Sequence, residues 1–99
     1  LNVNSMFRCC KGLQHVIFKN CELAGIEGVF LDSGIRHVTF DNCSDVYAIQ
    51  DYKVLASTVF DRNMDTLTLK NCDVTFVNAI VKMFEYEYNF ENLEIEILD

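Results

Sequence analysis

One pattern of apolar and polar positions recurs along this 99-residue chain. Each copy reads apolar-x-x-apolar-x-apolar, and the first three copies then reach an Asn-Cys pair. The copies occupy residues 13–23, 35–45 and 64–74, with a weaker one at 90–99. They begin 22, 29 and 26 residues apart. A period of this size is typical of repeat proteins, in which each unit packs its apolar face on its neighbours.

Alternating apolar and polar residues within each copy predict a short strand. The four predicted strands are residues 15–19, 37–41, 66–70 and 93–97. Two connections have helical spacing instead: 45–60, which Ser44 or Asp45 would cap, and 75–87, which Thr75 would cap. The connection between the first two strands is short and contains glycine, so we expect a 3₁₀ turn or an irregular crossing there. Parallel strands joined by right-handed crossovers would then form one sheet.

The repeated phrase resembles the leucine-rich repeat, whose consensus is L-x-x-L-x-L-x-x-N/C-x-L. In this register Cys21, Cys43 and Cys72 occupy the Asn/Cys position. The three apolar positions of each copy form inward rows: Leu13, Ile35, Met64 and Phe90; Val16, Val38, Leu67 and Leu93; Phe18, Phe40, Leu69 and Ile95. The resemblance covers residues 13–99, and residues 1–12 do not fit it. It implies an α/β fold, a short leucine-rich-repeat solenoid with one parallel sheet and helical or 3₁₀ connections.

We expect residues 1–99 to form a single repeat domain that is a segment of a longer protein. Its repeats lie near 13–34, 35–63, 64–89 and 90–99. The alternative fold is a right-handed parallel β-helix, because FKNCEL and LKNCDV resemble pentapeptide steps. The helical stripes and the irregular spacing of the copies favour the solenoid.

The net charge of −7 argues against nucleic acid as a partner, because phosphate binding needs a basic stripe. The chain has no run of 18 or more apolar residues, so we expect no contact with a membrane. The acidic residues concentrate near the C-terminal end, at Glu85, Glu87, Glu91, Glu94, Glu96 and Asp99. They form either a solvated face or a patch for a basic partner.

The chain contains five cysteines, but their spacing argues against a metal site. The three that follow the repeats are expected to be small buried hydrophobes. Reduced thiols of this kind indicate the cytoplasm. Adjacent Cys9 and Cys10, even with His15, lack the spacing of a structural zinc site, so we expect no metal and no cofactor. The chain carries no motif of a nucleophilic, phosphate-binding or metalloprotease active site, so we expect no enzyme activity.

The exposed face of the predicted sheet is the candidate binding surface, because side chains alternate between the two faces of a strand. The resemblance implies that this is the usual concave binding face. Three outward rows are expected: His15, His37, Thr66 and Asn92; Ile17, Thr39, Thr68 and Glu94; Lys19, Asp41, Lys70 and Glu96. The predicted partner-binding residues are His15, Ile17, Lys19, His37, Thr39, Asp41, Thr66, Thr68, Lys70 and Glu94.

These features predict a non-enzymatic scaffold that binds a protein partner through the exposed face of its sheet. Two alternatives remain open. One is the substrate-recognition arm of a ubiquitin ligase adaptor, because cysteine-containing repeats of this kind resemble those that follow an F-box. The other is a β-helical domain of a secreted bacterial effector or of a carbohydrate-binding protein. A ladder of stacked aromatic residues would favour carbohydrate, but the sequence shows Tyr86 and Tyr88 and no such ladder.

Overall fold

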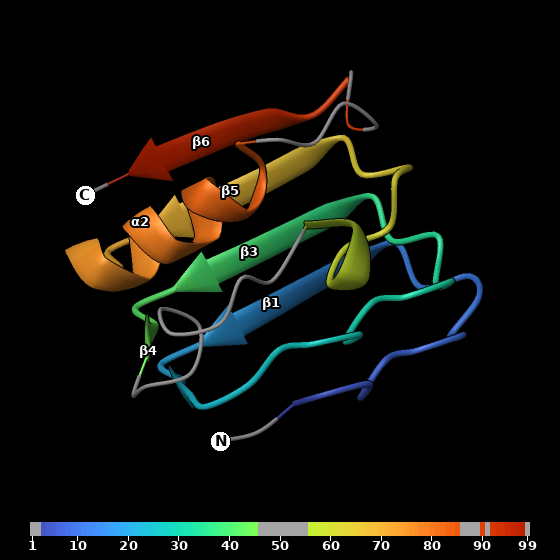
Figure 1. Ribbon diagram of the computed structural model, residues 1–99, viewed down its shortest axis with the longest axis horizontal. Helices are drawn as coiled ribbons and strands as arrows, with labels where there is room; N and C mark the ends of the chain where they lie inside the picture. The colour runs from blue at the N-terminus through green and yellow to red at the C-terminus, as the bar shows by residue number, and fades with distance from the viewer. Residues whose placement is uncertain (1–2, 46–55, 86–89, 91, 99) are drawn as a thin grey trace.

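Four parallel strands, placed side by side in chain order, form one layer of the molecule (Figure 1). The computed structural model describes residues 3–45, 56–85, 90 and 92–98. The sheet has the order β1-β3-β5-β6, with strands at His15–Lys19, His37–Asp41, Thr66–Lys70 and Glu94–Leu98. Within the described residues, an α-helix covers one face of this sheet, and the two together make a small α/β fold. Among the described residues, no helix has the length and apolar character needed to cross a membrane.

The first three strands begin and end at the residues that the alternating pattern predicts. Their inward side chains supply the front wall of the core. Val38, Phe40, Leu67 and Leu69 are all 0% exposed. Valine and phenylalanine favour strands because they fit a pleated, half-buried surface, so local preference and burial agree here.

The fourth strand corrects the sequence prediction. It begins at Glu94 instead of residue 93, and Ile95 and Ile97 pair with Leu67 and Leu69. The register expected from the sequence places Leu93 and Ile95 in those rows, two residues away. Leu93, Ile95 and Ile97 alternate with polar residues, and a two-residue slip leaves the same face inward. The apolar pattern alone therefore could not distinguish the two registers.

The Asn-Cys pairs form one turn three times over. Asn20, Asn42 and Asn71 follow strands β1, β3 and β5 with φ angles of 58°, 55° and 52°. This left-handed conformation is tolerated by asparagine better than by most residues. The backbone N–H of Asn20 donates to the carbonyl of Asp41 at 2.8 Å, and that of Asn42 to Lys70 at 2.8 Å. The side chain of Asn42 also donates to Oδ1 of Asn20 at 2.9 Å, so these two turns are linked directly.

The thiol groups repeat in the same way. The Sγ of Cys43 donates to the carbonyl of Phe18 at 3.3 Å, and that of Cys72 to Phe40 at 3.2 Å. Cys43 is buried as predicted, whereas Cys21 and Cys72 are partly exposed. Burial is thus deepest at the middle of the three turns, where a neighbour lies on each side.

Short strands follow two of these turns. Strand β2, Glu22–Leu23, pairs in parallel with β4, Ser44–Asp45. Ser44 and Asp45 therefore lie in an extended segment, which is the usual backbone conformation of an N-cap residue, and the prediction that one of them caps a helix stays a prediction. Residues 46–55 of that predicted helix lie outside the described residues, and the following element, η1, is a 3₁₀ turn at Ala56–Thr58.

A back layer of hydrogen-bonded rungs closes the core behind the strands. Residues 3–9 and 25–31, here called back rungs, run side by side. The N–H groups of Val3, Ser5 and Phe7 donate to the carbonyls of Gly25, Glu27 and Val29 at 2.9, 3.0 and 2.9 Å. Residues 1–12 fit no repeat in the sequence, yet the described part of this segment contributes one more rung. The connection between β1 and β3 contains no helix among the described residues, as expected.

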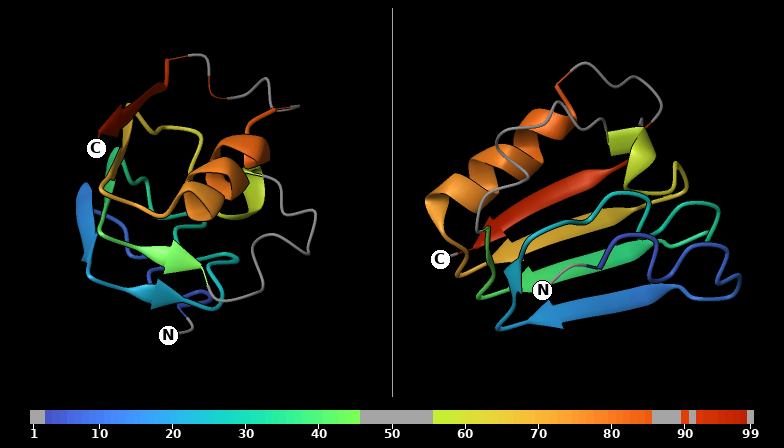
Figure 2. Two further views of the ribbon diagram at one scale, coloured as in Figure 1. Left: turned by 90° about the vertical axis from the view of Figure 1, so that its left-hand side faces the viewer. Right: turned by 60° about the horizontal axis from the view of Figure 1, so that its bottom comes forward.

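Helix α2, Val74–Met83, completes the back layer (Figure 2). Its buried residues are Phe76, Ile80 and Met83. The sequence predicts this helix at 75–87 with Thr75 as its N-cap, but Asp73 is the cap, and it accepts hydrogen bonds from the N–H and the hydroxyl of Thr75. Aspartate is among the strongest N-cap residues.

Phenylalanine rings link the two layers. Against the sheet, Phe40 lies between Phe18 and Phe76, with ring centroids 5.2 Å away on each side. Against the back layer, Phe30 lies between Phe7 and Phe60 at 5.8 and 6.1 Å. Because each ring contacts rings of neighbouring turns, the core extends through the molecule along the direction in which the strands are stacked.

Candidate functional site

The candidate site is the front face, defined as the outward side chains of β1, β3, β5 and β6. Strand pairing sets these side chains in three rows. The rows are His15-His37-Thr66-Glu94, Ile17-Thr39-Thr68-Glu96 and Lys19-Asp41-Lys70-Leu98. All predicted partner-binding residues on β1, β3 and β5 lie on this face, in the rows that the sequence predicts.

Glu94 lies on the front face but in a different row from the predicted one. It pairs with Thr66 instead of Thr68, because β6 is shifted by two residues. Glu96 takes its place beside Thr68, and Leu98 ends the third row beside Lys70. The shift brings a carboxylate into the histidine-containing row and leaves Leu98, 40% exposed, beside a lysine.

The first row is the most polar. The rings of His15 and His37 meet edge to face, with centroids 5.8 Å apart. The Nδ1 of His37 lies 2.8 Å from the hydroxyl oxygen of Thr66, a hydrogen bond that holds the half-buried ring in place. His15 is exposed at the end of the row. One fixed and one exposed imidazole therefore stand side by side, and both can offer hydrogen bonds to a ligand.

The second row carries the apolar centre of the face. Ile17 is 58% exposed, and Thr39 and Thr68 beside it are half-buried. In the third row, Lys19, Asp41 and Lys70 alternate in charge on neighbouring strands. Neighbouring strands are about 5 Å apart, so these charges offset one another across the row. The arrangement is an exposed aliphatic group bordered by hydroxyls and mixed charges.

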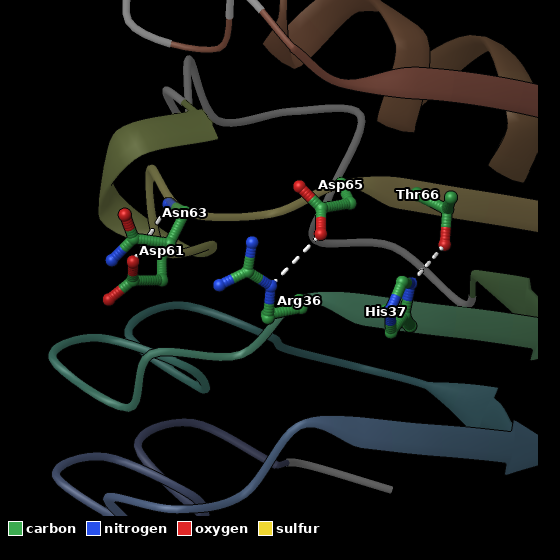
Figure 3. Close-up of polar contacts among 6 residues, drawn as sticks. All are labelled: Arg36, His37, Asp61, Asn63, Asp65 and Thr66. Carbon is green, nitrogen blue, oxygen red and sulfur yellow. Dashed lines mark hydrogen bonds and ion pairs between the residues drawn. The ribbon is translucent and has the colours of Figure 1, made fainter.

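A polar edge borders the front face where the strands begin (Figure 3). Arg36 Nε and Asp65 Oδ2 form an ion pair at 2.9 Å between half-exposed side chains. Nearby, the carboxylate of Asp61 accepts hydrogen bonds from the N–H groups of Gly34 at 3.1 Å and Asn63 at 2.9 Å. This edge is absent from the sequence-based predictions. Arg36 and Asp65 each stand directly before a strand, so their register could have revealed the pair.

The same edge borders a shallow cleft of about 510 Å³. Its lining is mainly polar and includes both charges: Cys9, Lys11, Gly12, Leu13, Gln14, Asp32, Ser33, Gly34, Arg36, Asp61 and Asn63. Arg36 and Asp61 are already engaged by groups of the chain itself. The cleft therefore extends the polar rim of the front face.

The cysteine turns behave as structural elements. Burial raises the pKa of the Cys43 thiol to about 11 and also raises the pKa of Cys72. At neutral pH both thiols are protonated and weakly nucleophilic. Cys9 and Cys10 are exposed. Within the described residues, no group of three or more His, Cys, Asp or Glu side chains could hold a metal ion.

A scan against protein-family models finds no matching family, and searches of curated proteins and of solved structures find no significant match. The geometry of the front face and of the ends of the sheet is therefore the basis for assigning a function.

Proposed function

We infer that this chain is a non-enzymatic module that binds a protein partner through its front face. The observation that carries the proposal is the row of Ile17, Thr39 and Thr68, an exposed aliphatic side chain beside two hydroxyls. Charged side chains of the neighbouring rows surround it. Protein interfaces have the same plan, an apolar centre within a polar rim.

The finer fold that we propose is a leucine-rich-repeat solenoid. Its support is the recurrence of one unit: a five-residue strand, a left-handed asparagine, a cysteine that donates to the preceding strand, and a back rung or helix. Helix α2 favours this fold over a parallel β-helix. A rigid sheet that presents one side chain from each strand in every row suits recognition of a folded protein surface.

A double substitution on the front face tests the proposal. Ile17→Glu with Thr39→Arg places two long charged side chains at the centre of the face. We expect binding of the partner to be lost, while the free energy of unfolding changes by about 0.5 kcal/mol or less, because exposed sites tolerate substitution. The measurement is quantitative mass spectrometry of proteins captured by the immobilised parent and by the variant.

A matched control introduces the same side chains elsewhere. Val74→Glu with Asn78→Arg changes two exposed residues of α2, on the back layer. The control should capture the same proteins as the parent. If the front-face variant also captures them, or if the control loses them equally, the front face is not the binding surface.

A further inference from the structure

The side chains of β6 that face the core side of the sheet are only partly covered. Ile95 is 37% exposed and Ile97 is 52% exposed, although their partners Leu67 and Leu69 are 0% exposed. An apolar cleft of about 390 Å³ lies beside Ile95, where Val81 and Phe84 of the α2 region contribute to its lining. The two isoleucines and this cleft make one apolar surface, here called the β6 end.

The backbone at the β6 end is also open to pairing. The N–H of Glu94 donates to the carbonyl of Asp65, and the carbonyl of Leu98 accepts from Asn71. Residues of a parallel strand alternate between their two neighbours. The backbone groups of Ile95 and Ile97 therefore face away from β5, toward an edge on which the described residues place no further strand.

The backbone at the opposite end of the sheet is also open to strand pairing. The carbonyl of Gln14 accepts from His37, and the N–H of Asn20 donates to Asp41, so Ile17 directs its backbone groups to the outer edge of β1. Residues 3–9 run behind β1 at this end (Figure 2). This β1 end thus offers a strand edge together with a back rung, and the β6 end offers a strand whose inward side chains are uncovered.

The charges of the two ends are opposite. The first 21 residues contain Arg8, Lys11 and Lys19 and no acidic residue. At the β6 end, Glu94 and Glu96 lie on β6 itself, and Glu85 and one lysine, Lys82, line the cleft beside Ile95, so acidic side chains are in excess there. Opposite potentials on two surfaces favour their encounter and fix their relative orientation.

We propose that the β6 end binds the β1 end of a second copy of this chain. Strand β6 then pairs in parallel with β1 of the second copy and continues the register of the sheet. This register sets Glu94 beside His15 of the second copy and Glu96 beside Ile17, with Lys19 as the diagonal neighbour of Glu96. The back rung of the second copy covers Ile95 and Ile97. Such a contact joins unlike surfaces, so it builds open head-to-tail chains.

Two edge prolines test this arrangement. Ile97→Pro and Ile17→Pro each remove one N–H that faces an outer edge, and edge strands tolerate proline. We expect the average mass of the parent, measured by sedimentation velocity, to rise with concentration. Each variant alone should remain monomeric, because every head-to-tail contact needs both ends. Circular dichroism and the melting temperature verify that the variants are folded.

Mixing the two variants gives the decisive measurement. Ile97→Pro retains an intact β1 end, and Ile17→Pro retains an intact β6 end. Together they should form one-to-one dimers that grow no further. A parent that stays monomeric overturns the proposal, and so does a mixture that stays monomeric while the parent associates. Association of Ile17→Pro alone would instead show a symmetric contact between β6 ends and would also overturn it.

A charge exchange repeats the test with substitutions at exposed positions. Glu96→Lys and Lys19→Glu each place like charges together in a head-to-tail contact of identical copies, whereas their mixture restores an opposite pair. We expect each variant to weaken association about threefold to tenfold and the mixture to recover it, because exposed charge pairs interact weakly. Raising the salt concentration from about 0.05 M to about 0.5 M should weaken association of the parent, because exposed charges are screened. Equal association of all three samples would contradict the proposed register.

Discussion

Strands β3 and β6 have the same length, direction and apolar alternation, yet they bury their inward side chains to different degrees. Val38 and Phe40 of β3 are 0% exposed, whereas Ile95 and Ile97 of β6 are 37% and 52% exposed. Strand β3 has neighbours on both sides, and β6 pairs with β5. The burial of a side chain in this fold therefore depends on the neighbouring turns more than on the strand that carries it.

Alanine substitutions give the largest contrast between the two strands. Phe40→Ala removes a ring that packs between two others, so it should reduce the free energy of unfolding by about 3–5 kcal/mol. Ile97→Ala should cost about 1 kcal/mol or less, because half of that side chain is already in solvent. Urea denaturation of both variants measures the difference. Similar losses would mean that the end strand is as deeply packed as β3.

Serine substitutions compare the cysteine turns. Cys43→Ser should reduce the free energy of unfolding by about 1–3 kcal/mol, because a shorter hydroxyl replaces a buried thiol that donates to Phe18 at 3.3 Å. Cys21→Ser should cost less than about 1 kcal/mol, since Cys21 is only partly buried. Thermal unfolding of the two variants tests the order. Equal effects would contradict the deeper burial of the middle turn.

The pH dependence of stability gives a second measure of how deeply the Cys43 thiol is buried. Burial raises the pKa of Cys43 from 9.0 to about 11, so the folded protein holds this proton in a range where the unfolded chain releases it. The stability that results is fully present below pH 9 and is lost as the pH rises toward 11. The loss from this thiol should be about 1 kcal/mol between about pH 8 and about pH 10.

A matched variant isolates this contribution from other titrating groups. Cys43→Ala lacks the thiol, so its free energy of unfolding should fall less steeply over the same pH range, as measured by urea denaturation at each pH. Identical slopes for the parent and Cys43→Ala would show that the thiol does not contribute.

The sequence predicts β3 correctly and β6 with the wrong register, and the local signals at the two strands explain the difference. The strands at 15–19, 37–41 and 66–70 were predictable because alternation, β-branched residues and the Asn-Cys turn all agree there. The fourth strand offers alternation alone, without the asparagine that fixes its end, and its expected register is wrong by two residues. The back rung at 3–9 could not be predicted because its hydrogen bonds join it to residues 25–31, and such pairing leaves no periodic signal in a single segment.

The candidate site also has parts that the sequence predicts and parts that it does not. The rows of the front face on β1, β3 and β5 were predictable, since correct strand boundaries and alternation place the outward side chains. The predicted row of Glu94 is wrong because it depends on the register of β6. The hydrogen bond between His37 and Thr66 depends on rotamers, which a pattern of residue types does not specify. The Arg36–Asp65 pair lies just outside the strands, beyond the positions that alternation describes.

The chain-ordered sheet has a mechanical consequence. Each strand of the order β1-β3-β5-β6 pairs with the strands that precede and follow it in the sheet, so detaching the last strand breaks its pairing with β5 and leaves the β1–β3 and β3–β5 pairs intact. A force applied to the C-terminal end would pull β6 away first, then β5, then β3. The molecule should therefore unfold under tension in successive steps. Each step would extend the chain by the length of one strand and its connection.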